Sequence, residues 1–247
     1  MEFAALLSDI HGNATALEAV MRDLEQQSIA RCFVLGDLAY RGAEPKRSIA
    51  LVQSLECPVI GGNADLWVTR GLRPGEVRES AFARMSVERE WTVEQLAAKD
   101  IAYLAELPDI HEETVDGLHF SLCHATPTDR FQVIGPHASD DELRSTFLAP
   151  DGLAAHFPQI VSYGHIHLPY IRHLDGCAVI NPGSVGLPFD GLPLASYAIV
   201  QIDRGQIAAT AIRRVRYDIE VAVDALKRVG YPEAARLERA LRTGTAP

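Results

Sequence analysis

The alternation of short apolar runs with helical patterns near the N-terminus constrains the fold more than any other feature. Residues 3–7 and 31–35 are apolar runs of strand length, and residues 58–60 form a shorter one. Between them, residues 13–27 and 45–56 carry apolar side chains at helical spacing. This strand–helix–strand–helix–strand order predicts three parallel strands with helices packed on the sheet.

The rest of the chain changes character twice. Residues 64–107 are mostly helical in pattern, and a long stretch of short strands separated by Gly, Asp and Pro turns follows. We expect these strands at residues 111–115, 118–123, 160–163, 170–174, 178–180, 196–202 and 206–212. A helical tail at about residues 218–243 is broken at residues 230–232. Residues 1–247 are therefore predicted to form a single α/β domain with two sheets.

Composition excludes several classes of protein. The chain has a net charge of −10, so we expect no binding of extended nucleic acid. No apolar run approaches the roughly 18 residues that a membrane span needs, and the N-terminus lacks the pattern of a secretory signal. The four cysteines form no CxxC pair, which favours reduced thiols. We expect a cytoplasmic protein without membrane contact, and a homo-oligomer is left open.

Polar side chains interrupt the chain where the predicted strands end. Seven of them offer an oxygen or an imidazole nitrogen as a donor atom: Asp9, His11, Asp37, Asn63, His124, His165 and His167. Asp9 and His11 are two residues apart, so strand periodicity would turn both toward the same point. The carboxyl ends of parallel strands line the crevice where α/β proteins bind ligands. This mixture of donors is typical of Mn²⁺, Fe, Zn²⁺ or Co²⁺ sites rather than Ca²⁺ sites.

Six blocks of sequence around these donors carry a family resemblance. They are SDIHGN (8–13), GDLAYRG (36–42), GGNAD (61–65), CHATP (123–127), GHIHLP (164–169) and NPGSVG (181–186). Together, over residues 3–217, they resemble the calcineurin-like metallophosphoesterases, and above all their small bacterial and archaeal phosphodiesterase branch. The resemblance implies a four-layer α/β/β/α sandwich of two mixed β-sheets flanked by helices, with a two-metal centre at its edge.

The resemblance also implies how two divalent transition-metal ions would be bound. The first ion would be held by Asp9, His11, Asp37 and His167. The second ion would be held by Asp37, Asn63, His124 and His165, so that Asp37 bridges the pair. Mn²⁺ is the first expectation for the metal, with Fe, Zn, Co or Ni as alternatives.

The charge of such a centre indicates the kind of substrate. Two divalent ions, two aspartates and a bridging hydroxide sum to about +1, although the chain as a whole is acidic. Paired metal ions about 3.5–4 Å apart activate water and hold phosphoryl oxygens for in-line attack. The predicted activity is therefore hydrolysis of small phosphodiesters or nucleotides by a metal-activated hydroxide.

One position departs from the wider family pattern. Many relatives have a histidine credited with protonating the leaving group, and this chain has Ala64 there. General acid catalysis contributes roughly 10²–10⁴-fold, so substrates with acidic leaving groups would be favoured. No catalytic side chain is predicted beyond the metal ligands, and His137 is the residue to test as a substitute proton donor. Arg41, Arg130 and Thr126 are predicted to contact substrate, although solvated loop arginines are equally consistent with the sequence.

Other polar residues near the motifs have a structural interpretation. Asp65 is predicted to cap the helix that follows it, and residues 181–186 to form a turn that supports the site. The remaining histidines lack the strand-end pattern and are interpreted as structural or surface residues: His111, His119, His156 and His173.

Two classes of function compete for this sequence. The first is a phosphoesterase acting on a small phosphate ester, with a phosphomonoesterase or a protein phosphatase as alternatives that use the same site. The second is a non-catalytic scaffold of the same fold, as in the retromer scaffold subunit, for which an altered ligand set would be expected. An amidohydrolase-type dinuclear enzyme would require HxH on the first strand of a barrel, and the strand-rich second half argues against it.

Overall fold

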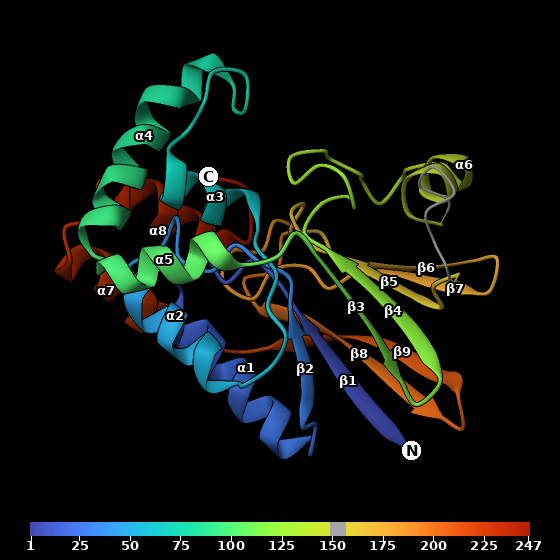
Figure 1. Ribbon diagram of the computed structural model, residues 1–247. Helices are drawn as coiled ribbons and strands as arrows, with labels where there is room; N and C mark the ends of the chain where they lie inside the picture. Colours follow the sequence, from blue (N-terminus) through green and yellow to red (C-terminus); the bar gives the residue numbers. More distant parts are fainter. Residues whose placement is uncertain (149–156) are drawn as a thin grey trace.

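The computed structural model describes residues 1–148 and 157–247, so His156 lies outside the described residues (Figure 1). Its strands are β1 (Glu2–Leu7), β2 (Arg31–Val34), β3 (Ile110–Val115), β4 (Leu118–Cys123), β5 (Ile160–Tyr163), β6 (Tyr170–Leu174), β7 (Cys177–Asn181), β8 (Ala195–Asp203) and β9 (Gln206–Val215). Its helices are α1 (Ala14–Gln26), α2 (Pro45–Ser54), α3 (Asn63–Arg70), α4 (Glu79–Glu94), α5 (Ala98–Glu106), α6 (Asp140–Leu143), α7 (Ile219–Arg228) and α8 (Ala234–Thr243), with a π-helical turn η1 (Arg144–Leu148) after α6. The predicted strands of the second half are confirmed within a few residues.

Two mixed sheets form the centre of the fold. The four-stranded sheet has the order β2-β1-β8-β9, in which β1 pairs parallel with β2 and antiparallel with β8. The five-stranded sheet has the order β3-β4-β5-β7-β6, in which β4, β5 and β7 are parallel. The edge strands β3 and β6 are antiparallel to their neighbours. The parallel strands place their carboxyl ends at a common edge of each sheet.

The predicted third parallel strand at residues 58–60 is wrong. This segment makes one parallel bridge, between Val34 and Val59, instead of a ladder. Pro58 has no N–H to donate, and Gly61 and Gly62 turn the chain away directly afterwards. The second neighbour of β1 is the antiparallel strand β8, so the sheet is mixed.

Strand alternation divides the core into layers. On β1, Ala4 and Leu6 belong to the apolar cluster between the two sheets, which also contains Phe120 of β4. Ala5 and Leu7 point the other way, into the cluster beneath the helices. Both faces of the central strands are therefore buried, which explains why they appear in the sequence as continuous apolar runs.

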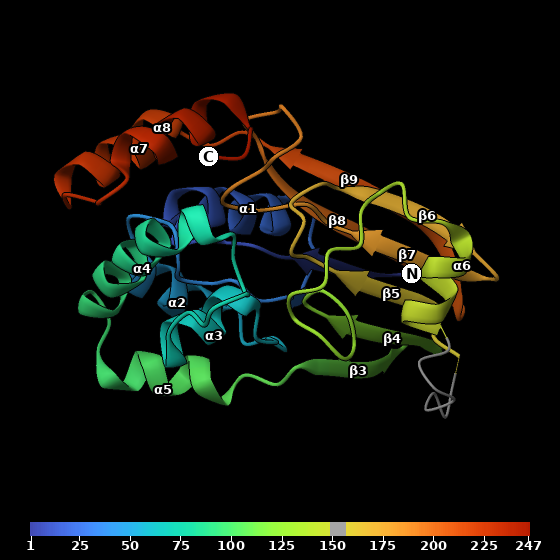
Figure 2. The ribbon, with the colours of Figure 1, turned by 90° about the horizontal axis from the view of Figure 1, so that it is seen from above.

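Helices cover the two outer faces unequally. α1 to α5 all contribute buried side chains to the cluster on the outside of the four-stranded sheet. The outside of the five-stranded sheet is covered by α6 and η1, through Leu143, Phe147 and Leu148. Figure 1 shows α1 and α2 on one side of the sheets and α6 on the opposite side, and Figure 2 shows this arrangement from above. The predicted α/β/β/α arrangement of two mixed sheets is confirmed.

The terminal helices α7 and α8 pack against each other and against the segment after β7. Leu187 of that segment lies in one buried cluster with Val223, Leu226 and Leu237 of the two helices. The helical tail therefore supports a loop that reaches the candidate site described below. In the part of the chain that the structure describes, no helix is both long and apolar enough to cross a bilayer.

Candidate metal centre

The seven predicted donor side chains gather in loops at the ends of strands from both sheets. Asp9 and His11 follow β1, Asp37 follows β2, His124 follows β4, His165 and His167 follow β5, and Asn63 begins α3. Six of them are at most 4% exposed, and His165 is half-buried. The sequence therefore identified side chains that the fold brings together.

The first group of donors consists of Asp9, His11, Asp37 and His167. One ligand atom of each residue lies within 4.8 Å of those of the other three. The Nε2 atom of His167 is 3.2 Å from Oδ1 of Asp9 and 3.1 Å from Nε2 of His11. The same His11 nitrogen is 3.6 Å from Oδ2 of Asp37. Two carboxylates and two imidazoles thus converge in a buried space of the size that a metal ion needs.

The second group consists of Asn63, His124 and His165. The amide oxygen Oδ1 of Asn63 is 2.9 Å from Nε2 of His124 and 2.8 Å from Nδ1 of His165. His124 Nε2 is also 3.5 Å from Oδ1 of Asp37. The two carboxylate oxygens of Asp37 therefore face different groups, as the resemblance implied for a bridging residue.

Backbone carbonyls fix the orientation of three histidine rings. Nδ1 of His11 lies 2.8 Å from the carbonyl oxygen of Tyr40, and Nδ1 of His124 lies 2.6 Å from that of Leu35. Nδ1 of His167 bonds to the carbonyl of Leu187. A carbonyl only accepts, so each Nδ1 donates its hydrogen, and each Nε2 of the neutral ring presents a lone pair to the site. Ring orientation by such bonds is usual for metal-binding histidines.

The contacts inside the site leave lone pairs facing each other. With Nδ1 protonated, the Nε2 atoms of His11 and His167 meet as two acceptors. Oδ1 of Asp9 is buried without a hydrogen-bond partner among the described residues. A cation would satisfy all of these atoms at once, so the residues present fit divalent metal ions.

The electrostatics of the protein alone show how strongly the groups interact. Burial opposes the charge of Asp37, but His124 outweighs it and lowers the pKa of the carboxyl to about 2. Burial also disfavours the charged form of His124, yet Asp37 and Asp9 raise its pKa to about 9. Burial and the neighbouring His124 lower the pKa of His165 to about 4. The site is thus a strongly coupled set of buried charges, as expected for a functional centre.

Five of the seven donors have a left-handed backbone. The φ angles are 57° for Asp9, 48° for His11, 58° for Asp37, 68° for His165 and 58° for His167. Because β1 ends at Leu7, this turn rather than strand periodicity brings Asp9 and His11 together. Such a conformation costs a residue with a Cβ roughly 1–2 kcal/mol, and it concentrates at functional sites.

Asp65 holds the loop that carries Asp37. Its buried carboxylate accepts hydrogen bonds from the backbone N–H groups of Asp37 (2.7 Å), Leu38 (2.9 Å) and Gly62 (2.9 Å). Asp65 lies in the first turn of α3 and not before the helix as predicted. Its bond to Gly62 caps that helix, and the other two bonds extend its role to the neighbouring strand end. Burial and the charge of Asp37 raise the pKa of Asp65 to about 6.

The turn at residues 181–186 supports Asp9, as predicted. The Oγ atom of Ser184 donates to the carbonyl oxygen of Asp9 at 2.7 Å and accepts from the N–H of Leu187 at 2.7 Å. The N–H of Gly186 also donates to the Asp9 carbonyl, at 3.0 Å. This turn therefore links the backbone of Asp9 to the carbonyl that orients His167.

Two glycines permit the close approach of backbone and ligand residues. A Cβ added at Gly62 would lie 2.0 Å from Oδ1 of Asp37, and one at Gly164 would lie 1.9 Å from Oγ of Ser8. Close packing rather than tight turning therefore explains glycine at both positions.

The residues predicted to contact substrate lie on two sides of the donors. Arg41 lines a small cavity with His11, and its Nε is buried without a hydrogen-bond partner among the described residues. Arg130 and Thr126 share another cavity, of about 390 Å³. Arg130 is paired with Asp109, and Thr126 bonds to Asp129 rather than to His124. Their contact with substrate stays a prediction.

Neither position considered for proton transfer has a side chain in contact with the donors among the interactions that the structure describes. The Ala64 side chain is 1% exposed and belongs to the cluster beneath the helices, while its N–H donates to Oδ1 of Asp37 at 2.8 Å. His137 is exposed in the loop before α6. Arg172 of β6 binds the carbonyls on either side of it, those of Pro136 and Ala138. His137 as a proton donor stays a prediction.

Sequence reasoning missed Phe189. Its ring stacks on the His167 ring, with centroids 4.2 Å apart and planes at 13°. On its other side it packs against the α7–α8 cluster. A phenylalanine three residues after the NPGSVG block carries no signal of this role, because the contact depends on how the loop folds back.

A two-sheet α/β/β/α sandwich with histidine, aspartate and asparagine donors at its strand ends defines a protein of the metallophosphoesterase class. Residues 1–205 match the calcineurin-like phosphoesterase superfamily domain. The chain belongs to this superfamily. Its members use divalent metal ions, which agrees with the cluster of candidate ligands, and membership suggests a hydrolase.

Individual proteins are similar to this chain over nearly its whole length. A metallophosphoesterase from Sphaerobacter thermophilus is 26% identical, with a TM-score of 0.75, and the match covers 98% of this chain and 99% of that one. A hypothetical protein from Pyrococcus horikoshii OT3 shares the fold at 20% identity, with a TM-score of 0.84 and complete (100%) coverage of both chains. An uncharacterized protein from Methanocaldococcus jannaschii is 29% identical over 93% of each chain.

Proposed function

We propose that the protein is a dinuclear metal-dependent phosphodiesterase that hydrolyses small phosphodiesters or nucleotides. One observation carries the proposal: Asp37 directs one carboxylate oxygen toward His11 of the first group, at 3.6 Å, and the other toward His124 of the second group, at 3.5 Å. A carboxylate shared in this way is the arrangement by which two metal ions are held side by side.

Each group of donors would hold one divalent ion. The first ion would be bound by Asp9, His11, Asp37 and His167, and the second by Asp37, Asn63, His124 and His165. When bound, the ions would supply Lewis acidity toward the phosphoryl oxygens and an activated water as nucleophile. Mixed nitrogen and oxygen donors favour Mn²⁺, Fe, Zn²⁺, Co²⁺ or Ni²⁺, and Mn²⁺ is the metal we propose first.

The residues of the chain set the conditions for that chemistry. Tyr40, Leu35 and Leu187 hold the imidazole rings through their carbonyls, so the donor nitrogens need no reorientation during turnover. Asn63 contributes a neutral oxygen where a further carboxylate would reduce the positive charge available to a phosphate anion. The ligands and their supports are buried, which keeps them largely out of water.

Two features favour small diesters with good leaving groups. Ala64 offers no proton to a leaving group, and its methyl group is buried in the cluster beneath the helices. Arg130 lines a cavity of about 390 Å³, within the range of small-molecule sites, and its guanidinium contacts the carbonyl of Gly62, next to the donor Asn63. A small phosphate ester is therefore proposed as substrate.

A substrate panel tests the proposal. Bis-nitrophenyl phosphate, nitrophenyl phosphate, 2′,3′-cyclic nucleotides and a dinucleoside tetraphosphate would each be assayed with Mn²⁺ and with EDTA. We expect Mn²⁺-dependent turnover of the diester above that of the monoester, and its loss in EDTA. Asp37→Asn should reduce turnover by at least about 10²-fold, by analogy with the loss of a group that stabilises the transition state.

Asp224→Asn provides the matched control, because Asp224 is exposed on α7. This variant should retain the parent activity. Absence of metal-dependent turnover with every substrate, together with an Asp37→Asn variant that behaves like the parent, would contradict the enzyme proposal. Faster turnover of the monoester than of the diester would instead favour a phosphomonoesterase.

A further inference from the structure

Two cysteines face each other at the end of the sheet remote from the donor groups. Cys32 lies on β2, and Cys57 lies in the segment that bridges to it. The parallel bridge pairs Val34 with Val59, and each cysteine precedes a bridged residue by two positions, so the bridge brings the two cysteines near each other. The bonds from Val34 N–H to the Pro58 carbonyl (3.0 Å) and from Ile60 N–H to the Val34 carbonyl (2.9 Å) hold this register.

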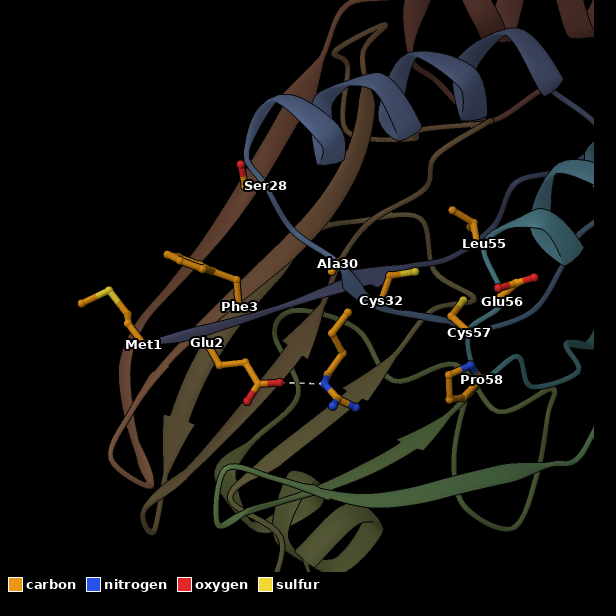
Figure 3. Close-up of a pocket in the computed structure, with 11 residues that line it drawn as sticks. Met1, Glu2, Phe3, Ser28, Ala30, Cys32, Leu55, Glu56, Cys57 and Pro58 are labelled. Carbon is orange, nitrogen blue, oxygen red and sulfur yellow. Dashed lines mark hydrogen bonds and ion pairs between the residues drawn. The ribbon is translucent and has the colours of Figure 1, made fainter.

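The two sulfur atoms lie close together. The Cys57 thiol forms a hydrogen bond with the sulfur of Cys32. Figure 3 shows the Cys32 and Cys57 side chains side by side, with their sulfur atoms directed into the same space.

The pair is accessible from a cavity. A cavity of about 440 Å³ is lined by both cysteines together with Phe3, Arg31, Glu56 and Pro58. Cys32 itself is 4% exposed, whereas Cys57 is half-buried and lies at the opening. The cavity has the size of common small-molecule sites, so a small reagent can reach the thiols.

The two thiols also differ in acidity. A hydrogen bond from the Cys57 thiol to the sulfur of Cys32 lowers the pKa of Cys32, and the same bond raises the pKa of Cys57. The thiolate is the nucleophile in disulfide exchange, so Cys32 is the attacking member of the pair.

We propose that Cys32 and Cys57 form a reversible dithiol–disulfide site that reacts with small disulfides such as oxidised glutathione. The Cys32 thiolate attacks one sulfur of the small disulfide, breaks its S–S bond and releases one glutathione. Cys57 then attacks the Cys32 sulfur of the mixed disulfide and releases the second glutathione. Two protein thiols are oxidised to one disulfide, one small disulfide is reduced to two thiols, and the two thiol protons end on the released molecules.

The other cysteines provide internal controls. Cys123 is 2% exposed and Cys177 is 0% exposed. Burial raises the pKa of both thiols, which makes them unreactive in the folded protein. Selective oxidation of the Cys32–Cys57 pair therefore separates this site from general oxidation of an unfolded chain.

The experiment treats the reduced, folded full-length protein with oxidised glutathione, stops the exchange with acid, alkylates the remaining thiols in denaturant at neutral pH, and identifies the peptides by mass spectrometry. We expect one peptide pair linked through Cys32 and Cys57, with Cys123 and Cys177 alkylated, and complete reversal by excess reduced glutathione. Equal oxidation of all four cysteines, or full alkylation of Cys32 and Cys57 after prolonged exposure, would overturn the proposal.

Single variants identify the order of the two steps. Cys57→Ser should stop at the mixed disulfide and carry the mass of one glutathione on Cys32, because the resolving thiol is missing. Cys32→Ser should react at least about tenfold more slowly, since it lacks the more acidic thiol. Circular dichroism checks that both variants are folded. A Cys57→Ser protein that gains no glutathione would also overturn the proposal.

Discussion

The two groups of the candidate metal centre differ in the charge and the burial of their donor side chains. The first group contains two carboxylates and two histidines, all at most 4% exposed. The second group adds only neutral donors to the shared Asp37, and its His165 is half-buried. Charge and shielding are therefore concentrated on one side of Asp37.

From this difference we expect the two sides to have separate tasks. A divalent ion in the first group would face the charges of Asp9 and Asp37, whereas one in the second group would face the charge of Asp37 alone. Coulomb attraction in a buried site grows with each carboxylate, so the first group should bind metal more tightly. The second group would leave its ion more charge with which to attract a phosphate.

Replacing Asp37 should affect both halves and produce the largest change. In Asp37→Asn, each group loses a charged oxygen, so the dialysed protein should hold much less than the parent's content of Mn²⁺. Elemental analysis of the purified variant beside the Asp224→Asn control measures this. Loss of metal from one group only would show that Asp37 is not shared.

Alanine substitutions in each group test directly whether the first group binds metal more tightly than the second. Asp9→Ala should weaken the tighter of two Mn²⁺ binding events, whereas His165→Ala should weaken only the other. We expect a loss of about 10–100-fold in affinity for His165→Ala, in the range seen when a metal site is disturbed without losing charge, and a greater loss for Asp9→Ala. Calorimetric titration resolves the two events. Equal losses for the two variants would remove the distinction between the groups.

A glycine substitution tests the close packing around the shared carboxylate. In Gly62→Ala, the new Cβ would lie 2.0 Å from Oδ1 of Asp37, so Asp37 must move. We expect the free energy of unfolding to fall by about 1–3 kcal/mol, as for an overpacked core. In the matched variant Gly135→Ala, the Cβ meets nothing within 4 Å, and the change should stay within about 0.5 kcal/mol. Urea denaturation of both variants measures the difference.

Removing an ion pair that lies outside both groups should cause the smallest change, and this change should be in the stability of the fold. Asp23 of α1 accepts two bonds from Arg213 of β9, at 3.0 and 2.7 Å, and one from Tyr197 at 2.7 Å. The bonds from Arg213 lower the pKa of Asp23. The ion pair therefore contributes fully to the free energy of unfolding above the ordinary aspartate pKa. This contribution is lost as the pH falls through the pKa that Asp23 has in the folded protein.

The corresponding variant is Asp23→Asn, with an expected loss of about 1 kcal/mol at pH 7. The difference between parent and variant should shrink below about pH 4, because the parent carboxylate becomes protonated there. Urea denaturation at pH 7, 5 and 3 measures it, and Mn²⁺ binding at pH 7 should not change. A change in metal affinity would mean that the groups depend on the packing of α1 as well as on their own ligands.

Local patterns in the sequence were sufficient to predict most of the strands and helices. β4 and β8 could be placed because strand alternation and turn residues are local signals. Residues 58–60 were misassigned because an apolar run does not show that Pro58 and the two following glycines limit the pairing with β2 to a single bridge. The pairing of β1 with β8 joins segments almost the whole chain apart, and no local pattern specifies it.

The donor residues themselves were predictable, but their supports were not. Asp9 and His165 were identifiable because a polar residue after a buried strand is conspicuous. Neighbours such as the Ser184 turn impose the left-handed backbone at both residues. The residue types aspartate and histidine do not by themselves predict that conformation. The stacking of Phe189 and the proximity of Cys32 to Cys57 depend likewise on contacts between distant segments.

The left-handed backbone of five donor residues has a consequence for how metal and folding are linked. An unfolded chain rarely visits that conformation, so it has little ability to collect these ligands around an ion. Competition from the denatured ensemble is then small, and almost the full binding free energy appears as resistance to unfolding. At a free metal concentration a thousandfold above the dissociation constant, that amounts to about 4 kcal/mol per ion.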